Sequence, residues 1–178
     1  MRKSYQYFIS IILILILLNS CVIYELEDLF IECDAPHNIS YILVDDHNYS
    51  PDNSIPITNE DIKTIHIDGS RKSCARYIFN RWPEFIKTLP NNTLTVLIFH
   101  TDTVSHYTWD QIRQEYKVLV RYDIGVEDYN MLPGTNKSVT IPYPPAPSME
   151  SVHMYPPYDQ VMAQYDADCQ KIATMEEN

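Results

Sequence analysis

The sequence predicts an α/β or α+β fold in which two or three helices pack on a mixed sheet of about five strands. Short runs of β-branched and aromatic residues alternate along the chain with stretches whose apolar residues recur every three or four positions. Residues 94–99 (Leu-Thr-Val-Leu-Ile-Phe) are apolar at nearly every position, which is typical of a central strand buried on both faces. Only three glycines occur in 178 residues, which argues against a glycine-rich barrel or a repetitive β array.

The region before this central strand contains two predicted strands and one predicted helix. Residues 39–44 form a β-branched and aromatic run, and residues 64–67 form a second, shorter one. Between residues 71 and 89, apolar side chains recur at the spacing of an amphipathic helix. Pro83 is expected to bend or split this helix.

The region after the central strand continues the alternation of helices and strands. Thr108 and Gln111 have the Thr-x-x-Gln spacing of a capping box, which predicts a helix that begins at Trp109. Residues 117–122 are typical of a strand, and turn residues then lead into a short helix. A strand at residues 139–141 completes the predicted order β, β, α, β, α, β, α, β.

The N-terminal segment has the three-part layout of a secretory signal. Two basic residues come first, residues 8–18 are almost entirely Ile and Leu, and a polar step leads to a cysteine. The motif Leu18-Asn19-Ser20-Cys21 resembles the lipobox of bacterial lipoprotein precursors, although an Asn at its second position departs from the usual small residue. The resemblance implies that residues 1–20 are a lipoprotein signal peptide and that Cys21 is acylated and becomes the first mature residue.

An uncleaved membrane helix over residues 7–24 is the alternative interpretation of this segment. A bilayer core requires about 20 predominantly apolar residues, whereas the uninterrupted apolar run covers only residues 8–18. Either interpretation places the rest of the chain outside the cytoplasm. The lipoprotein resemblance implies attachment in the cell envelope, at the outer membrane, and leaves the periplasmic and surface-exposed orientations open.

A second resemblance lies between residues 100 and 145. Thr-Asp-Thr-Val follows a buried strand, a Tyr-Thr-Trp helix start and Val-Leu-Val-Arg-Tyr-Asp come next, and Tyr-Pro-Pro ends the segment. This pattern is similar to a group of small bacterial lipoproteins of the Bacteroidota. The resemblance implies origin and localisation, and it transfers no catalytic residue to this chain.

One domain with tails is expected after the signal, because the remaining chain is long enough for a single sizeable core. A tether from lipidated Cys21 is expected over residues 21–37, a globular domain over residues 38–145, and a Pro/Tyr-rich wrap with an acidic C-terminal tail over residues 146–178. The later cysteines, Cys33, Cys74 and Cys169, permit three alternative pairings with one thiol left over. No Cys-x-x-Cys spacing supports a zinc ribbon or a thioredoxin-type redox centre.

The charge of the chain limits its partners. Without the two basic residues of the signal, 11 Lys and Arg stand against 24 Asp and Glu, a net charge of −13. Such a chain repels phosphate backbones, and no Lys/Arg cluster reverses the field locally, so nucleic acid is not an expected partner. Anionic lipid headgroups are repelled as well, which leaves the lipid anchor as the expected attachment to the membrane.

His100, Asp102 and His106 are candidate metal ligands, because they follow the carboxyl end of the predicted central strand. Two imidazoles and a carboxylate can hold a divalent metal and leave one coordination position open. The spacing matches no established metal signature, and solvated loop residues capped onto the next helix explain it equally well.

Three tyrosines in the proline-rich C-terminal region are candidate binding residues. Tyr143 and Tyr155 are each followed by two prolines, and Tyr158 comes directly after the second pair. This density of proline favours extended, polyproline-like backbone from which tyrosines project as a docking surface. The alternative is a segment that wraps the domain and packs its tyrosines on the core.

The sequence therefore predicts a membrane-anchored envelope lipoprotein that acts as a non-enzymatic binding or assembly component, with an envelope protein or glycan as its partner. No Gly-x-Ser-x-Gly, Ser-x-x-Lys or His-Glu-x-x-His motif occurs, and no cofactor is expected. The alternative is a metal-assisted envelope hydrolase that uses His100, Asp102 and His106.

Overall fold

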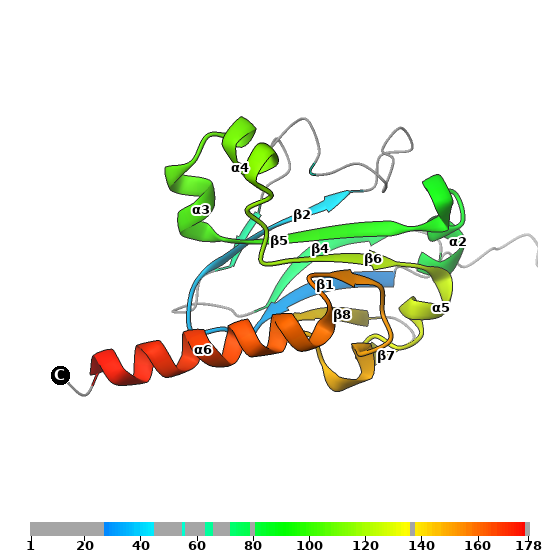
Figure 1. Ribbon diagram of the computed structural model, residues 1–178. Helices are drawn as coiled ribbons and strands as arrows, with labels where there is room; N and C mark the ends of the chain where they lie inside the picture. The colour runs from blue at the N-terminus through cyan, green and yellow to red at the C-terminus, as the bar shows by residue number, and fades with distance from the viewer. Residues whose placement is uncertain are drawn as a thin grey trace, which may run out of the picture.

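The computed structural model describes residues 27–44, 55, 63–65, 72–78, 81–135 and 138–176. The predicted signal segment and Cys21 lie outside these residues. The sequence predicts an α/β or α+β fold, and the mixture of strands and helices along the chain confirms the α+β class. The described strands form two sheets rather than one, with the orders β4-β1-β8-β7 and β3-β2-β5-β6-β9 (Figure 1).

The four-stranded sheet is built around β1. Its strands are β1 (Glu27–Cys33), β4 (Lys72–Ile78), β7 (Gly134–Thr135) and β8 (Ser138–Tyr143). β1 is antiparallel to β4 and parallel to β8. The tether predicted over residues 21–37 includes residues 27–33, which the structure places in this strand. These residues form a strand because Leu29, Ile31 and Cys33 alternate along it and direct one face of β1 into the core, where all three are fully buried.

The five-stranded sheet is antiparallel throughout and has β5 at its centre. Its strands are β2 (Ile39–Val44), β3 (Lys63–Ile65), β5 (Leu94–His100), β6 (Val120–Ile124) and β9 (Met154–Tyr155). Residues 94–99 are fully buried, which confirms the predicted central strand. The strand predicted at residues 117–122 begins three residues later, because the chain first completes the end of a helix at Tyr116.

Five α-helices accompany the sheets in the described residues: α2 (Trp82–Ile86), α3 (Thr101–His106), α4 (Trp109–Glu115), α5 (Val126–Tyr129) and α6 (Tyr158–Glu176). The predicted capping box of α4 is confirmed. The backbone N–H of Gln111 donates to Thr108 Oγ1 at 3.3 Å, and the Gln111 side chain accepts from the Thr108 backbone N–H at 2.9 Å.

The helix predicted over residues 71–89 is wrong, because this segment forms β4 followed by the short α2. β4 pairs with the free edge of β1, and this tertiary pairing overrides the helical spacing of the sequence. Pro83 lies in the first turn of α2, where its missing N–H leaves no helical hydrogen bond unmade. Trp82 fixes the start of α2, since its backbone N–H donates to Glu27 Oε2 at 2.9 Å and its indole N–H donates to the Glu27 carbonyl at 3.3 Å.

The region predicted as a wrap and acidic tail, residues 146–178, contains β9 and the 19-residue helix α6. Val161 is buried, and Tyr165, one turn later, packs against the main core. The Tyr165 hydroxyl also donates to the Asp34 carbonyl at 3.1 Å, which ties the helix to the end of β1. No helix in the described part of the chain is both long and apolar enough to cross a membrane.

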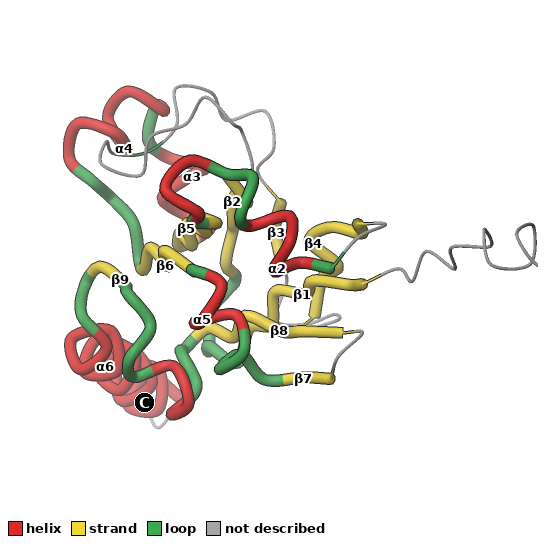
Figure 2. Tube along the Cα trace, turned by 90° about the vertical axis from the view of Figure 1, so that its right-hand side faces the viewer, coloured by secondary structure: helices red, strands yellow, loops and turns green. Residues whose placement is uncertain are grey.

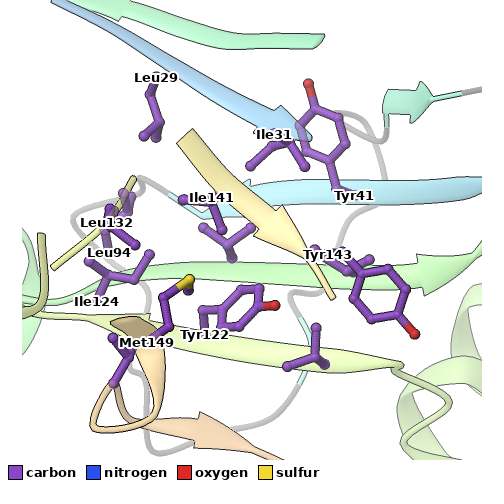
Figure 3. Close-up of a cluster of buried hydrophobic side chains, with 14 of the residues drawn as sticks. Leu29, Ile31, Tyr41, Leu94, Tyr122, Ile124, Leu132, Ile141, Tyr143 and Met149 are labelled. Carbon is purple, nitrogen blue, oxygen red and sulfur yellow. The ribbon is translucent and has the colours of Figure 1, made fainter. Parts of the chain in front are cut away.

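Side chains from both sheets meet in the main hydrophobic core (Figure 3). Leu29 and Ile141 come from the four-stranded sheet, and Leu94, Tyr122 and Ile124 come from the five-stranded sheet. A second, smaller apolar cluster lies on the other face of the five-stranded sheet, where α3 and α4 are found (Figures 1 and 2). The five-stranded sheet is therefore the middle layer of the molecule.

Candidate functional site

The outer face of the five-stranded sheet is apolar along one half and polar along the other. On β5, Leu97 and Phe99 belong to the apolar cluster, which is completed by Ile112 of α4. Two residues earlier on the same face, Thr95 is paired with Asp123 of β6. The change from apolar to polar side chains along one strand face marks where the cover provided by α4 ends.

The polar half opens into a cleft of about 530 Å³, a size within the usual range for small-ligand sites. Two adjacent strands, β6 and β9, supply part of its lining, and the segments before β5, after α4 and before β9 supply the rest. The lining consists of Asn91, Thr93, Tyr116, Arg121, Asp123, His153 and Tyr155. The pairing of β6 with β9 sets Arg121 opposite Tyr155, so these two side chains share the outer face. The Asp123 backbone N–H donates to the His153 carbonyl at 2.9 Å, so Asp123 lies beside His153 just beyond the paired residues of β6 and β9.

A buried ion pair forms the floor of the cleft. Arg121 Nε donates to Asp123 Oδ1 at 2.8 Å, and the side chains are each only 10% exposed. The Thr95 hydroxyl donates to the same carboxylate oxygen at 2.7 Å. His153 Nδ1 lies 3.2 Å from Asp123 Oδ2, and its imidazole is largely exposed to solvent. Asp123 is therefore the common partner that holds side chains from β5, from β6 and from the residue before β9 in fixed positions.

Two tyrosines form an aromatic wall beside this floor. Tyr155 is 56% exposed, and the Tyr116 ring meets it edge to face with centroids 5.2 Å apart. Tyr116 ends α4 in the left-handed conformation, with φ of 49°, and this turn brings its side chain back over the sheet. Burial raises the pKa of Tyr116, while a hydrogen bond from Arg121 acts in the opposite direction. Tyr116 thus remains a neutral phenol at physiological pH.

The rim of the cleft opposite the aromatic wall comes from the loop before β5. Asn91 and Asn92 both have positive φ, 54° and 53°, a backbone region that asparagine tolerates better than most residues. The backbone N–H of Thr93 donates to the Pro90 carbonyl at 3.2 Å and closes this turn. The turn places the side chains of Asn91 and Thr93 at the cleft.

The predicted metal ligands do not come together as a metal site. His100 Nδ1 accepts from the Asp102 backbone N–H at 3.2 Å, and His106 Nδ1 lies 2.8 Å from the Asp102 carbonyl oxygen. One ring nitrogen of each histidine is therefore used to stabilise α3. No group of three or more His, Cys, Asp or Glu side chains in the described ranges is arranged to hold a metal ion.

The ring of His100 instead stacks on His37, with centroids 4.4 Å apart and an interplanar angle of 21°. His37 Nε2 is buried and has no hydrogen-bond partner. Burial lowers the pKa of His37, and proximity to His100 lowers it further, although Asp168 and Asp102 act in the opposite direction.

The predicted binding tyrosines occupy three different environments. Tyr143 is buried at the end of β8 and belongs to the main core. Tyr158 is half-buried at the start of α6 and packs against that core. Tyr155 alone of the three lines the cleft.

The residues of the cleft floor were not identified as a site from the sequence. Arg121 and Asp123 alternate with Tyr122 in β6, which places two charges on one face of an apolar sheet. The predicted strand ends at Tyr122, so it leaves Asp123 in the following turn. That alternation is the signal available in the sequence.

Comparisons with protein-family models, with curated proteins and with solved structures find no match for this chain.

The buried ion pair generates a stability prediction. In Asp123→Leu the guanidinium of Arg121 is left without its carboxylate, and we expect the free energy of unfolding to fall by about 3–5 kcal/mol. The double variant Arg121→Met/Asp123→Leu removes both charges, so most of this loss is recovered. Urea unfolding of the single and double variants measures the difference.

Glu84→Gln is the matched control for this experiment, because the exposed pair between Lys87 and Glu84 has the same 2.8 Å separation. It is expected to change the stability by less than about 1 kcal/mol. A single Asp123→Leu variant as stable as the wild type would show that the floor pair is not coupled to folding.

The lowered pKa of His37 generates a pH prediction. The unfolded chain takes up this proton at a higher pH than the folded chain, so acidification favours unfolding. We expect stability to decline as the pH falls below the ordinary histidine value of about 6.5 and to level off, for this group, below the folded pKa. His37→Asn should show a shallower decline in urea unfolding between pH 7.5 and 5.5; an unchanged decline would contradict the assignment.

Proposed function

We propose that this chain is a lipid-anchored component of the bacterial cell envelope that binds a ligand in the cleft and does not catalyse a reaction. The observation that carries the proposal is the cleft itself. A buried ion pair, a threonine and a histidine form a fixed polar floor, and an exposed tyrosine stands directly beside it. A concave surface with a few convergent polar groups and an aromatic wall is the usual composition of a recognition site.

The contacts within the floor favour binding over catalysis. Both oxygens of Asp123 already face donors or a histidine nitrogen, and the Arg121 guanidinium is held by that carboxylate and by Tyr116. Groups that satisfy one another in this way are preorganised as a rigid surface. A general base or nucleophile must instead keep its reactive atom available to the substrate.

The proposed anchor holds this surface near a membrane. The first described strand begins at Glu27, six residues after Cys21, and a fully extended chain of that length spans at most about 20 Å. Acyl chains contribute about 0.8 kcal/mol for each buried methylene, so more than one chain is required for stable attachment. The net negative charge of the chain disfavours attachment through anionic headgroups.

The anchor is tested by Cys21→Ser in cells supplied with labelled palmitate. We expect the wild-type chain to carry the label, and the variant to lose it and to accumulate as the uncleaved precursor. Absence of label from both forms would contradict lipid anchoring and would favour the uncleaved membrane helix.

Occupancy of the cleft is tested by placing the photo-crosslinking residue p-benzoylphenylalanine at position 155. We expect light-dependent adducts in intact cells, because the Tyr155 side chain lies at the cleft and is exposed. Position 107 is the matched control, since Tyr107 is a similarly exposed tyrosine, 43% accessible, outside the cleft lining. Equal adduct formation at both positions, or none at position 155, would contradict the assignment of the cleft as the binding site.

A further inference from the structure

We propose that the ligand of the cleft is a neutral, hydroxyl-rich carbohydrate, one unit of a glycan whose ring stacks on Tyr155 while its hydroxyls bond the floor and rim. This inference rests on the proposed binding function of the cleft and specifies the chemical class of the ligand. Charge, hydrogen-bonding capacity and aromatic geometry support it independently.

The charge of the cleft favours an uncharged ligand. Arg121 and Asp123 neutralise each other at 2.8 Å, and the other lining residues include no Lys, Arg, Asp or Glu. An anionic ligand would have to compete with Asp123 for the guanidinium, at the cost of leaving a buried carboxylate unpaired. It would also approach a chain whose net charge is −11 before any processing.

The hydrogen-bonding groups at the cleft match hydroxyls. The Thr93 hydroxyl donates to the Asn91 carbonyl at 3.1 Å and can still accept, whereas the Tyr116 hydroxyl accepts from Arg121 and can still donate. Asn91 carries an amide donor and an amide acceptor, and His153 has a second ring nitrogen beyond the one at Asp123. A sugar hydroxyl also donates one hydrogen bond and accepts others. Paired donors and acceptors of this kind recognise a polyol without requiring a formal charge on either side.

The aromatic wall supplies the remaining part of such a site. The rings of Tyr116 and Tyr155 meet edge to face with centroids 5.2 Å apart, and this contact orients the exposed Tyr155. The π-face of a tyrosine carries partial negative charge, and the C–H groups on one side of a pyranose ring carry partial positive charge. Stacking the ring on Tyr155 would bury its apolar side and direct its hydroxyls toward the floor.

The strand at the edge of the cleft argues against a peptide as the occupant. An extended peptide that adds to a sheet requires a run of free backbone groups along an edge strand. β9, at the edge of the five-stranded sheet, contains only Met154 and Tyr155. The side chains of the cleft, rather than its backbone edge, therefore provide the contact surface.

The test uses the full-length chain, purified in detergent, on immobilised probes of three kinds. These are neutral oligosaccharides of glucose, galactose, mannose and N-acetylglucosamine, sulfated or uronic-acid-containing counterparts, and unstructured peptides. We expect binding to a neutral oligosaccharide that falls about tenfold or more in Tyr155→Ala and is largely retained in Tyr155→Phe. Thr93→Val should weaken it by a few-fold, and Tyr107→Ala, the exposed-tyrosine control, should leave it unchanged.

The outcomes separate the ligand class from the site. Binding confined to acidic glycans or peptides, but lost in Tyr155→Ala, would overturn the carbohydrate inference and preserve the cleft as a binding site. Binding that Tyr155→Ala leaves intact would overturn both. If no probe binds while cross-linking at position 155 succeeds, the neutral-glycan inference is overturned alone. Unchanged urea midpoints for the variants exclude loss of folding as the cause.

Discussion

The burial of β5 on both faces is the constraint on which the rest of the structure depends. Its inner face packs against the four-stranded sheet, so β1 and β8 must be present for the core to close. Its outer face requires a second cover, and α4 supplies it only over Leu97 and Phe99. Beyond that cover, Thr95 on the same strand face is buried beside the polar side chains of the cleft floor. Thr95 and the Arg121–Asp123 ion pair supply polar side chains where α4 no longer covers the sheet, and the cleft lies at this position.

The choice of an ion pair at this position is not explained by stability. Removing Arg121 and Asp123 from water costs several kcal/mol for each charge, and their attraction in the folded state roughly offsets this cost. Well-packed apolar side chains of similar volume are often as stabilising or more so. What the pair provides is orientation: Asp123 fixes Thr95, Arg121 and His153, and Arg121 in turn bonds Tyr116. A rigid polar floor beneath an exposed tyrosine favours a role in recognition.

The parts of the fold that were predictable are those in which local pattern and tertiary context agree. Residues 94–99 are apolar at every position except Thr95, and the capping box at Thr108 is a purely local signal; the central strand and the capping box are both confirmed. The helix predicted over residues 71–89 is wrong because a seven-residue segment can fit both a strand pattern and a helix pattern. Pairing with β1 makes this segment the strand β4. The cleft was not predictable in the same way. Arg121 meets Tyr155 only through the β6–β9 pairing, which joins residues more than 30 positions apart.

An open cleft at a sheet edge also determines what kind of affinity is attainable. Each neutral hydrogen bond contributes a net stabilisation of only about 0.5–1.5 kcal/mol, and a shallow site forms few of them. One sugar unit bound through Tyr155 and the neighbouring polar groups would therefore be held weakly. Anchoring through Cys21, as proposed, would change this balance, because many copies confined to one surface would engage a repeating polymer together. Once the first copy is bound, the others bind at a high effective concentration, and overall avidity exceeds single-site affinity by about 10²–10⁴-fold when the geometry permits simultaneous contact. A weak, rigid, neutral site near a membrane is thus suited to a polymeric ligand and poorly suited to a free metabolite.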